Sequence, residues 1–190
     1  MQAVIRRNRR GVEQGLLTEV LPWIRARPTG GMIMLVDVSN IFSKYAEKHP
    51  RSTRLVEEYI ASRQEMGSLC DTRLRRFLED TLAEFPHLRA EDIPRIRHAL
   101  QAKQVAWVFV MQGSVPHRAI TTTTFPRKPC LAVHVSCTNR EGKNCYQTGS
   151  RKNPMDDYTL LFLHHQLHQE GIPSFVLTMD RFNDWKKMMS

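Results

Sequence analysis

Several motifs and sequence features are missing from this chain of 190 residues, and each absence narrows the class of protein. No run of about 18 apolar residues occurs, so the sequence predicts no membrane-spanning helix. The four cysteines form no CxxC pair, which argues against a disulfide framework and favours a reducing, intracellular compartment, cytoplasmic or nuclear. The motifs GxxxxGK[ST], HExxH and GxSxG are also missing, which disfavours P-loop nucleoside triphosphatases, zinc peptidases and hydrolases with a nucleophile elbow.

Negative charge is scarce as well. The chain has 19 Asp and Glu residues against 28 Lys and Arg residues, so its formal net charge is +9. A basic excess of this size favours a polyanionic partner, most often a nucleic acid. The hydrophobic content of 41% is that of an ordinary globular protein with a core of its own.

The first thirty residues combine an arginine cluster with a helical pattern. The cluster, RRNRR at 6–10, precedes apolar residues at helical spacing, which are Val12, Leu16, Leu17, Val20, Leu21 and Ile24. We interpret 1–30 as a basic N-terminal helical extension of a domain that spans 31–190. It could grip phosphates, pack on the domain with a solvated basic end, or serve as a mitochondrial presequence, although Glu13 and Glu19 count against the last role.

Short apolar runs alternate with helical patterns along the rest of the chain. The predicted buried strands are 32–38, 106–111, 130–136 and 173–179. Residues 51–103 look helical, with breaks at Pro86 and Pro94, and 153–171 reads as a helix that ends at Gly171. This alternation predicts an α/β fold with a parallel sheet and helices on both faces. Right-handed crossovers then bring the carboxyl ends of the strands to one edge, where such sheets bind ligands.

Five acids fall near that edge. Asp37 ends the first strand, Asp180 follows the last, Asp184 comes four residues later, and Asp156 with Asp157 opens the 153–171 helix. Clustered carboxylates repel one another without a cation, and they are the ligands that Mg²⁺ and Mn²⁺ prefer. A basic protein with an acidic metal pocket suggests metal-assisted cleavage of phosphodiesters.

Each acid also has a simpler interpretation. Asp156 could complete a capping box, Asp180 could cap a short helix, and Asp184 could be a solvated surface acid. Asp37 is harder to explain in this way, because an Asp on an apolar strand is costly unless it is paired, hydrogen-bonded or bound to a metal. The shared location of the acids therefore carries more weight than any one of them.

Three segments resemble a known family. VDVSN at 36–40, MDDYTLLFLHHQLHQEG at 155–171 and VLTMDRFNDW at 176–185 are similar to motifs of PIN-like nucleases of the NYN group, and of the regnase-type ribonucleases in particular. The resemblance spans about 32–186, with its specific matches in these three motifs. It implies a PIN-like (Rossmann-like) α/β/α sandwich with a central, mostly parallel sheet. It also implies Mg²⁺- or Mn²⁺-dependent cleavage of RNA, usually single-stranded, by a metal-activated water that leaves 5′-phosphate and 3′-hydroxyl ends.

The resemblance also implies roles for individual residues. The expected metal and catalytic residues are Asp37, Asp157, Asp180 and Asp184, with Asp156 either joining them or capping its helix. The expected substrate contacts are Asn40, which could instead orient Asp37, together with Lys152, Arg151 and Thr178. There are two departures from the regnase type: the chain has no CCCH zinc finger, and Met179 stands where those members often carry Asn.

Other functions stay open at this point. The chain could be a catalytically weak or inactive nucleic-acid-binding module on the same fold, or an interaction protein whose N-terminal helix binds a partner or a second copy. A structural zinc on Cys130, Cys137 and Cys145 with a histidine is disfavoured because the cysteine spacings match no common zinc pattern. A zinc site on His164 and His168, which share a helix face, is disfavoured because a third ligand is not evident and no HExxH motif is present. The polar segments 121–129 and 138–144 could line an RNA groove or be ordinary loops.

Overall fold

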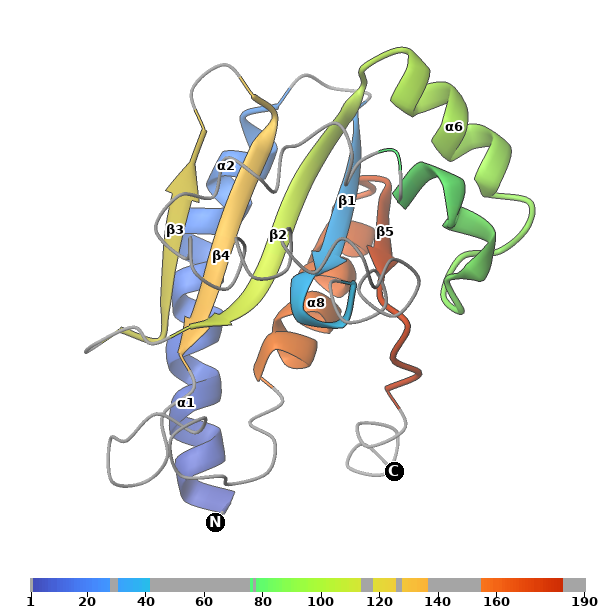
Figure 1. Cartoon of the computed structure of the whole chain (residues 1–190). Coiled ribbons are helices and arrows are strands. Elements are labelled where there is room, and N and C mark those ends of the chain that lie inside the picture. The colour runs from blue at the N-terminus through green and yellow to red at the C-terminus, as the bar shows by residue number, and fades with distance from the viewer. Residues whose placement is uncertain are drawn as a thin grey trace, which may run out of the picture.

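A central five-stranded sheet organises the protein (Figure 1). The computed structural model describes residues 2–27, 31–41, 76, 78–113, 118–125, 128–136 and 155–182. The strands are β1 (Met32–Asp37), β2 (Val105–Gly113), β3 (Ile120–Thr124), β4 (Cys130–Ser136) and β5 (Ser174–Leu177), in the order β3-β4-β2-β1-β5. β4, β2, β1 and β5 are mutually parallel, and β3 pairs antiparallel with β4 at one edge.

The four parallel strands confirm the strands predicted from apolar runs. Their side chains alternate between two separate cores, because successive residues of a strand face opposite sides of the sheet. In β1, Ile33 and Leu35 enter the first core, whereas Met34 and Val36 enter the second. Both faces are therefore buried, which explains why the strand reads as one continuous apolar run.

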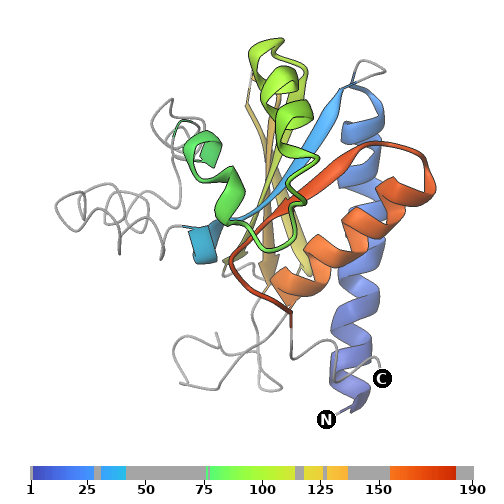
Figure 2. The ribbon, with the colours of Figure 1, turned by 90° about the vertical axis from the view of Figure 1, so that its right-hand side faces the viewer.

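The first face is covered by the N-terminal helical segment and by α8 (Met155–Gln169), as Figure 2 shows. The N-terminal segment consists of α1 (Gln2–Gly15), a π-helical stretch (Leu16–Val20) and α2 (Leu21–Arg25). Its buried residues are Val12, Leu16, Val20, Leu21 and Ile24. They join the same core as α8, so this segment packs on the sheet, which was one of the roles left open by its sequence.

Glycine allows the N-terminal helix to approach the antiparallel edge strand closely. A Cβ placed on Gly15 would lie 2.5 Å from Cγ1 of Ile120 in β3. Real Cβ atoms do not come so near another carbon, so a larger side chain would push the helix and the strand apart. The seating of the N-terminal segment therefore depends on the absence of a side chain at this position.

The second face is covered by 78–85 and by α6 (Ile93–Gln101) (Figure 2). Leu78, Leu82, Phe85 and Ile96 pack here against the inner side chains of β1 and β2. The chain is therefore an α/β protein with a mostly parallel sheet and helices on both faces. No helix of the described ranges is both long and apolar enough to cross a membrane.

Two expectations need correction. Residues 121–124 were assigned to a polar loop, but they form most of β3, because threonine is β-branched and fits a half-exposed edge strand. The helical reading of 51–103 is confirmed over 78–80 and over Ile93–Gln101, whereas 82–84 form only a short 3₁₀ turn. The segments 51–75 and 138–144 lie outside the described residues.

Candidate functional site

Three carboxylates meet where the parallel strands end. β1 and β5 are neighbours, with Val36 in register with Leu177, so Asp37 and the residues after β5 lie side by side. Asp156 comes to the same edge from the first turn of α8. Asp156 and Asp180 lie near enough for their negative charges to raise the pKa of Asp37, after burial as the main cause.

Asp37 is the most strongly perturbed of these acids. Its side chain belongs to a residue that is only 4% exposed, and this burial is the largest cause that raises its pKa to about 6. The charges of Asp156 and Asp180 raise the pKa further, because a second negative charge nearby disfavours ionisation. Hydrogen bonds from Thr178 and Asn40 act in the opposite direction and lower it.

Both carboxylate oxygens of Asp37 are held in place. The backbone N–H of Asn40 donates to Oδ1 at 3.1 Å, within a helical turn at 38–41 that follows β1 directly. The hydroxyl of Thr178 donates to Oδ2 at 2.7 Å. The orientation of the carboxylate is thus fixed by one contact from the turn after β1 and one from the residue that follows β5.

The segment after β5 is tied down by a series of further hydrogen bonds. The N–H of Met179 donates to Oδ1 of Asn40 at 2.6 Å, and the N–H of Asp180 donates to Oγ1 of Thr178 at 3.1 Å. The N–H of Phe182 donates to Oδ1 of Asp180 at 2.8 Å. Thr178 therefore donates to one acid and accepts from the backbone of the next.

A histidine from the second face completes this support. Nε2 of His87 donates to the carbonyl oxygen of Asp180 at 2.6 Å, because a carbonyl can only accept. The imidazole ring also stacks on Phe182 with 4.9 Å between ring centroids. Nothing in the sequence near His87 indicated this contact, since 93 residues separate it from Asp180.

Of the two acids that open α8, Asp156 is the buried one. It is 8% exposed, and burial raises the pKa of its carboxyl, whereas a hydrogen bond from Gln112 and backbone N–H groups lower it. One of those donors is the N–H of Asp157, at 3.0 Å from Oδ1. Asp157, which the resemblance placed among the metal ligands, is only half-buried. The structure thus brings Asp156 to Asp37 and Asp180, whereas the role of Asp157 as a metal ligand stays a prediction.

The first turn of α8 is anchored to the N-terminal helix. The hydroxyl of Tyr158 donates to the carboxylate of Glu13, and the guanidinium of Arg9 lies over the Tyr158 ring, 4.6 Å from its centroid. Arg9 also pairs with Glu13 at 3.5 Å. Because Tyr158 is two residues from Asp156, these contacts help to fix the helix end that carries the acid.

Other expected site residues have different outcomes. Thr178 was expected to touch substrate, but it is fully buried and supports Asp37 instead. Asn40 stays half-exposed while its side chain holds the segment after β5, so it acts as a positioning group. Asp184, Lys152 and Arg151 lie outside the described residues.

The zinc alternatives gain no support from the described residues. His164 is half-buried and shares a hydrogen bond of 2.9 Å with Ser174, and burial lowers the pKa of its imidazole. Cys130 is buried in the sheet, and Cys137 and Cys145 lie outside the described ranges. Across the part of the chain that the structure describes, no group of three or more His, Cys, Asp or Glu residues is arranged to hold a metal ion.

The chemistry of the acid cluster nevertheless suits a hard cation. Two buried carboxylates with raised pKa values and a third nearby concentrate negative charge at the carboxyl edge of the sheet. A divalent cation with oxygen ligands would neutralise that charge. The oxygens that accept one hydrogen bond each still have a second lone pair with which to bind a cation.

Comparison of the chain with protein-family models, curated proteins and solved structures finds no match. The candidate site is therefore defined by its own geometry. It consists of Asp37, Asp156 and Asp180, with Asn40, Thr178 and His87 as their supports. We call this set the acidic edge.

Proposed function

We propose that the chain is a metal-dependent endoribonuclease with a PIN-like fold, related to the regnase-type members of the NYN group. The supporting observation is that Asp37, Asp156 and Asp180 come from three separate elements and converge on the carboxyl edge of a mostly parallel sheet. Ligand sites in sheets of this kind lie at that edge. The net charge of +9 adds a reason for a polyanionic substrate.

The acidic edge would supply the metal ligands. Asp37, Asp156 and Asp180 would hold Mg²⁺ or Mn²⁺, and Asp157 and Asp184 stay predicted additions to the set. When bound, such an ion activates a water and neutralises charge on the scissile phosphate. A bound cation would offset both the burial and the charge repulsion that raise the pKa of Asp37.

The supporting groups would keep the acids ready for that ion. Thr178 and the N–H of Asn40 hold the two oxygens of Asp37, and His87 holds the backbone of Asp180. A ligand set that is already oriented spends less binding free energy on ordering its side chains. Lys152 and Arg151 stay predicted contacts to the flanking phosphates.

A second function is a nucleic-acid-binding module with weak or no catalysis on the same fold. It is favoured by the lack, within the described ranges, of three acidic or imidazole groups close enough to hold an ion together. It is also favoured by the hydrogen bond that each oxygen of Asp37 already accepts, because a bound ion would have to share those oxygens with the two donors. In this case, the positive charge would bind RNA while the acidic edge did no chemistry.

Cleavage of labelled single-stranded RNA and DNA, with Mg²⁺, with Mn²⁺ and with EDTA, separates the two functions. We expect RNA cleavage only with a divalent ion, and a loss of at least a hundredfold in Asp37→Asn, Asp156→Asn and Asp180→Asn. Glu170→Gln is the matched control, because it makes the same change from carboxylate to amide at the other end of α8.

The outcomes differ clearly. If the wild type cuts nothing under any condition but binds RNA, and the three variants bind equally well, the binding module is correct. If the variants cut as fast as Glu170→Gln does, the acidic edge is not the catalytic site.

A further inference from the structure

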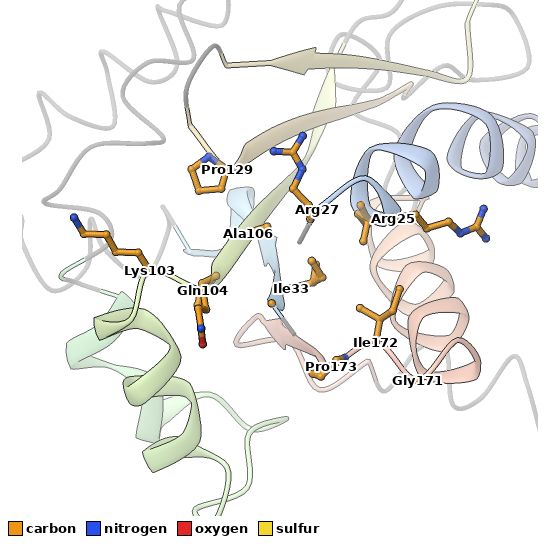
Figure 3. Close-up of a pocket in the computed structure, with 13 residues that line it drawn as sticks. Arg25, Arg27, Ile33, Lys103, Gln104, Ala106, Pro129, Gly171, Ile172 and Pro173 are labelled. Atoms are coloured by element: carbon orange, nitrogen blue, oxygen red, sulfur yellow. The ribbon is translucent and has the colours of Figure 1, made fainter. Parts of the chain in front are cut away.

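A cavity lies at the opposite edge of the sheet, where the parallel strands begin. Its volume is about 430 Å³, and it is bounded by the end of α2, the starts of β1 and β2, and the turn after α8 (Figure 3). The lining residues that matter for its chemistry are Arg25, Arg27, Ile33, Lys103, Ala106 and Ile172. A volume of this size is in the range of small-molecule sites, roughly 300–1,000 Å³.

The floor of this cavity is apolar. Ile33 and Ala106 come from neighbouring strands and belong to the first core, and Ile172 packs against that core from the turn after α8. Figure 3 shows Ile33, Ile172 and Pro173 together on one side, with Pro129 facing them across the opening. Such a surface favours an aliphatic or aromatic body over a purely polar ligand.

The rim of the cavity is cationic. Arg27 and Lys103 stand on different sides of it, and no lining residue in the described part of the chain is acidic. The guanidinium carbon of Arg27 lies 4.2 Å from the centroid of the Trp23 ring. The Nε–H of Arg27 also donates a hydrogen bond to the carbonyl oxygen of Trp23, so the side chain is held in place. Arg25 differs, because it is turned away and pairs with Glu170 at 2.5 Å.

This cavity is separate from the acidic edge. Ile33 lies near the start of β1, and Asp37 is the last residue of that strand. Four residues of extended chain span roughly 13 Å. A small molecule in the cavity would therefore not touch the acids, and its binding does not depend on nuclease activity.

We propose that this cavity binds a small amphiphilic carboxylate. Its aliphatic or aromatic body lies on Ile33, Ala106 and Ile172, and its carboxylate lies at the rim beside Arg27, with Lys103 adding positive charge from another side. Arginine is well suited to the head group, because its planar guanidinium can donate two parallel hydrogen bonds to a carboxylate. The apolar floor and the cationic rim together favour this class of ligand over neutral hydrocarbons, which lack the charge, and over small inorganic anions, which lack the apolar body.

Calorimetric titration with three probes tests the selectivity. Octanoate carries both features, 1-octanol has a similar body without the charge, and acetate has the charge with almost no body. We expect octanoate to bind saturably with one site per chain, at least tenfold tighter than either of the other probes. No saturable binding of octanoate, or equal affinity for octanol, would overturn the proposal.

Variants test the position of the head group. In the double variant Arg27→Gln and Lys103→Asn we expect octanoate affinity to fall about tenfold, with octanol binding unchanged. Asn is chosen at 103 because the backbone there has a positive φ of 55°, which Asn tolerates. Arg97→Gln, on an exposed position of α6 away from this cavity, is the matched control and should bind octanoate as the wild type does.

Amide chemical shifts measured in the wild type locate the binding site without any substitution that could disturb the fold. Octanoate should shift the signals of Gly31, Ala106 and Gly171, which line the cavity. Shifts confined to other parts of the chain would refute the site even if octanoate binds. Wild-type affinity in the double variant would refute the cationic rim.

Discussion

Replacement of Asp37 by Asn should stabilise the metal-free protein at alkaline pH. Burial is the main cause that raises the pKa of Asp37 from its ordinary 3.8 to about 6, so the folded protein holds this proton more tightly than the unfolded chain. Stability is therefore lost as the pH rises from about 4 through 6. The rise in pKa corresponds to about 3 kcal/mol at pH 8.

An amide can keep both hydrogen bonds without a charge. Its oxygen can accept from the N–H of Asn40, and its NH₂ group can donate to Oγ1 of Thr178, which reverses the direction of the hydrogen bond that Thr178 makes to Asp37. We expect Asp37→Asn to be more stable than the wild type by about 2–3 kcal/mol at pH 8, and nearly equal to it at pH 4. Urea denaturation in the presence of EDTA, followed by circular dichroism at both pH values, measures the difference.

Asp80→Asn is the control, because Asp80 is exposed and its replacement should change stability by less than about 0.5 kcal/mol. If Asp37→Asn is less stable than the wild type at pH 8, or differs from it equally at both pH values, burial of the charge is not costly and the reasoning fails. Saturating Mg²⁺ at pH 8 should raise the stability of the wild type but not of Asp37→Asn. Equal gains would argue against Asp37 as a metal ligand.

Three further changes test the packing and the supports. Tyr158→Phe removes the hydroxyl that donates to Glu13 and should cost about 1 kcal/mol in urea denaturation, so an unchanged midpoint would contradict an anchoring role. Gly15→Ala should lower the free energy of unfolding by about 1–3 kcal/mol, because its Cβ would collide with Ile120. This loss should exceed the gain from the higher helix propensity of Ala, and a higher melting temperature of the variant would refute the prediction. Asn40→Ala should lower the free energy of unfolding by about 1 kcal/mol and speed hydrogen exchange at the N–H of Met179, which donates to the Asn40 side chain. Unchanged exchange at Met179 would show that this hydrogen bond does not hold the segment after β5.

The parallel strands could be predicted from the sequence because they are buried on both faces. β1, β2, β4 and β5 each appear in the sequence as a short apolar run. Because these runs alternate with helical patterns, the sequence alone predicts a mostly parallel sheet. β3 escaped prediction, since its threonines resemble a polar loop unless their β-branching is weighed. The convergence of acids at the carboxyl edge followed from topology alone.

Details of the site could not be predicted in the same way. Neighbouring residues on a helix differ by about 100° in direction, so the sequence did not decide which of Asp156 and Asp157 is buried. The roles of Thr178 and His87 depend on contacts across 141 and 93 residues of chain. No local pattern predicts contacts of that kind.

The hydrogen bond between Thr178 and Asp37 also bears on how the protein folds. It closes a loop of 141 residues. Contacts so distant in sequence form late in folding, because closing a long loop costs conformational entropy before the contact contributes any stability. β5 is an edge strand of four residues, and its docking moves Asp180 toward two like charges. A cation present during folding would remove this repulsion, so the rate of the last docking step should depend on divalent ions even where the preceding collapse does not.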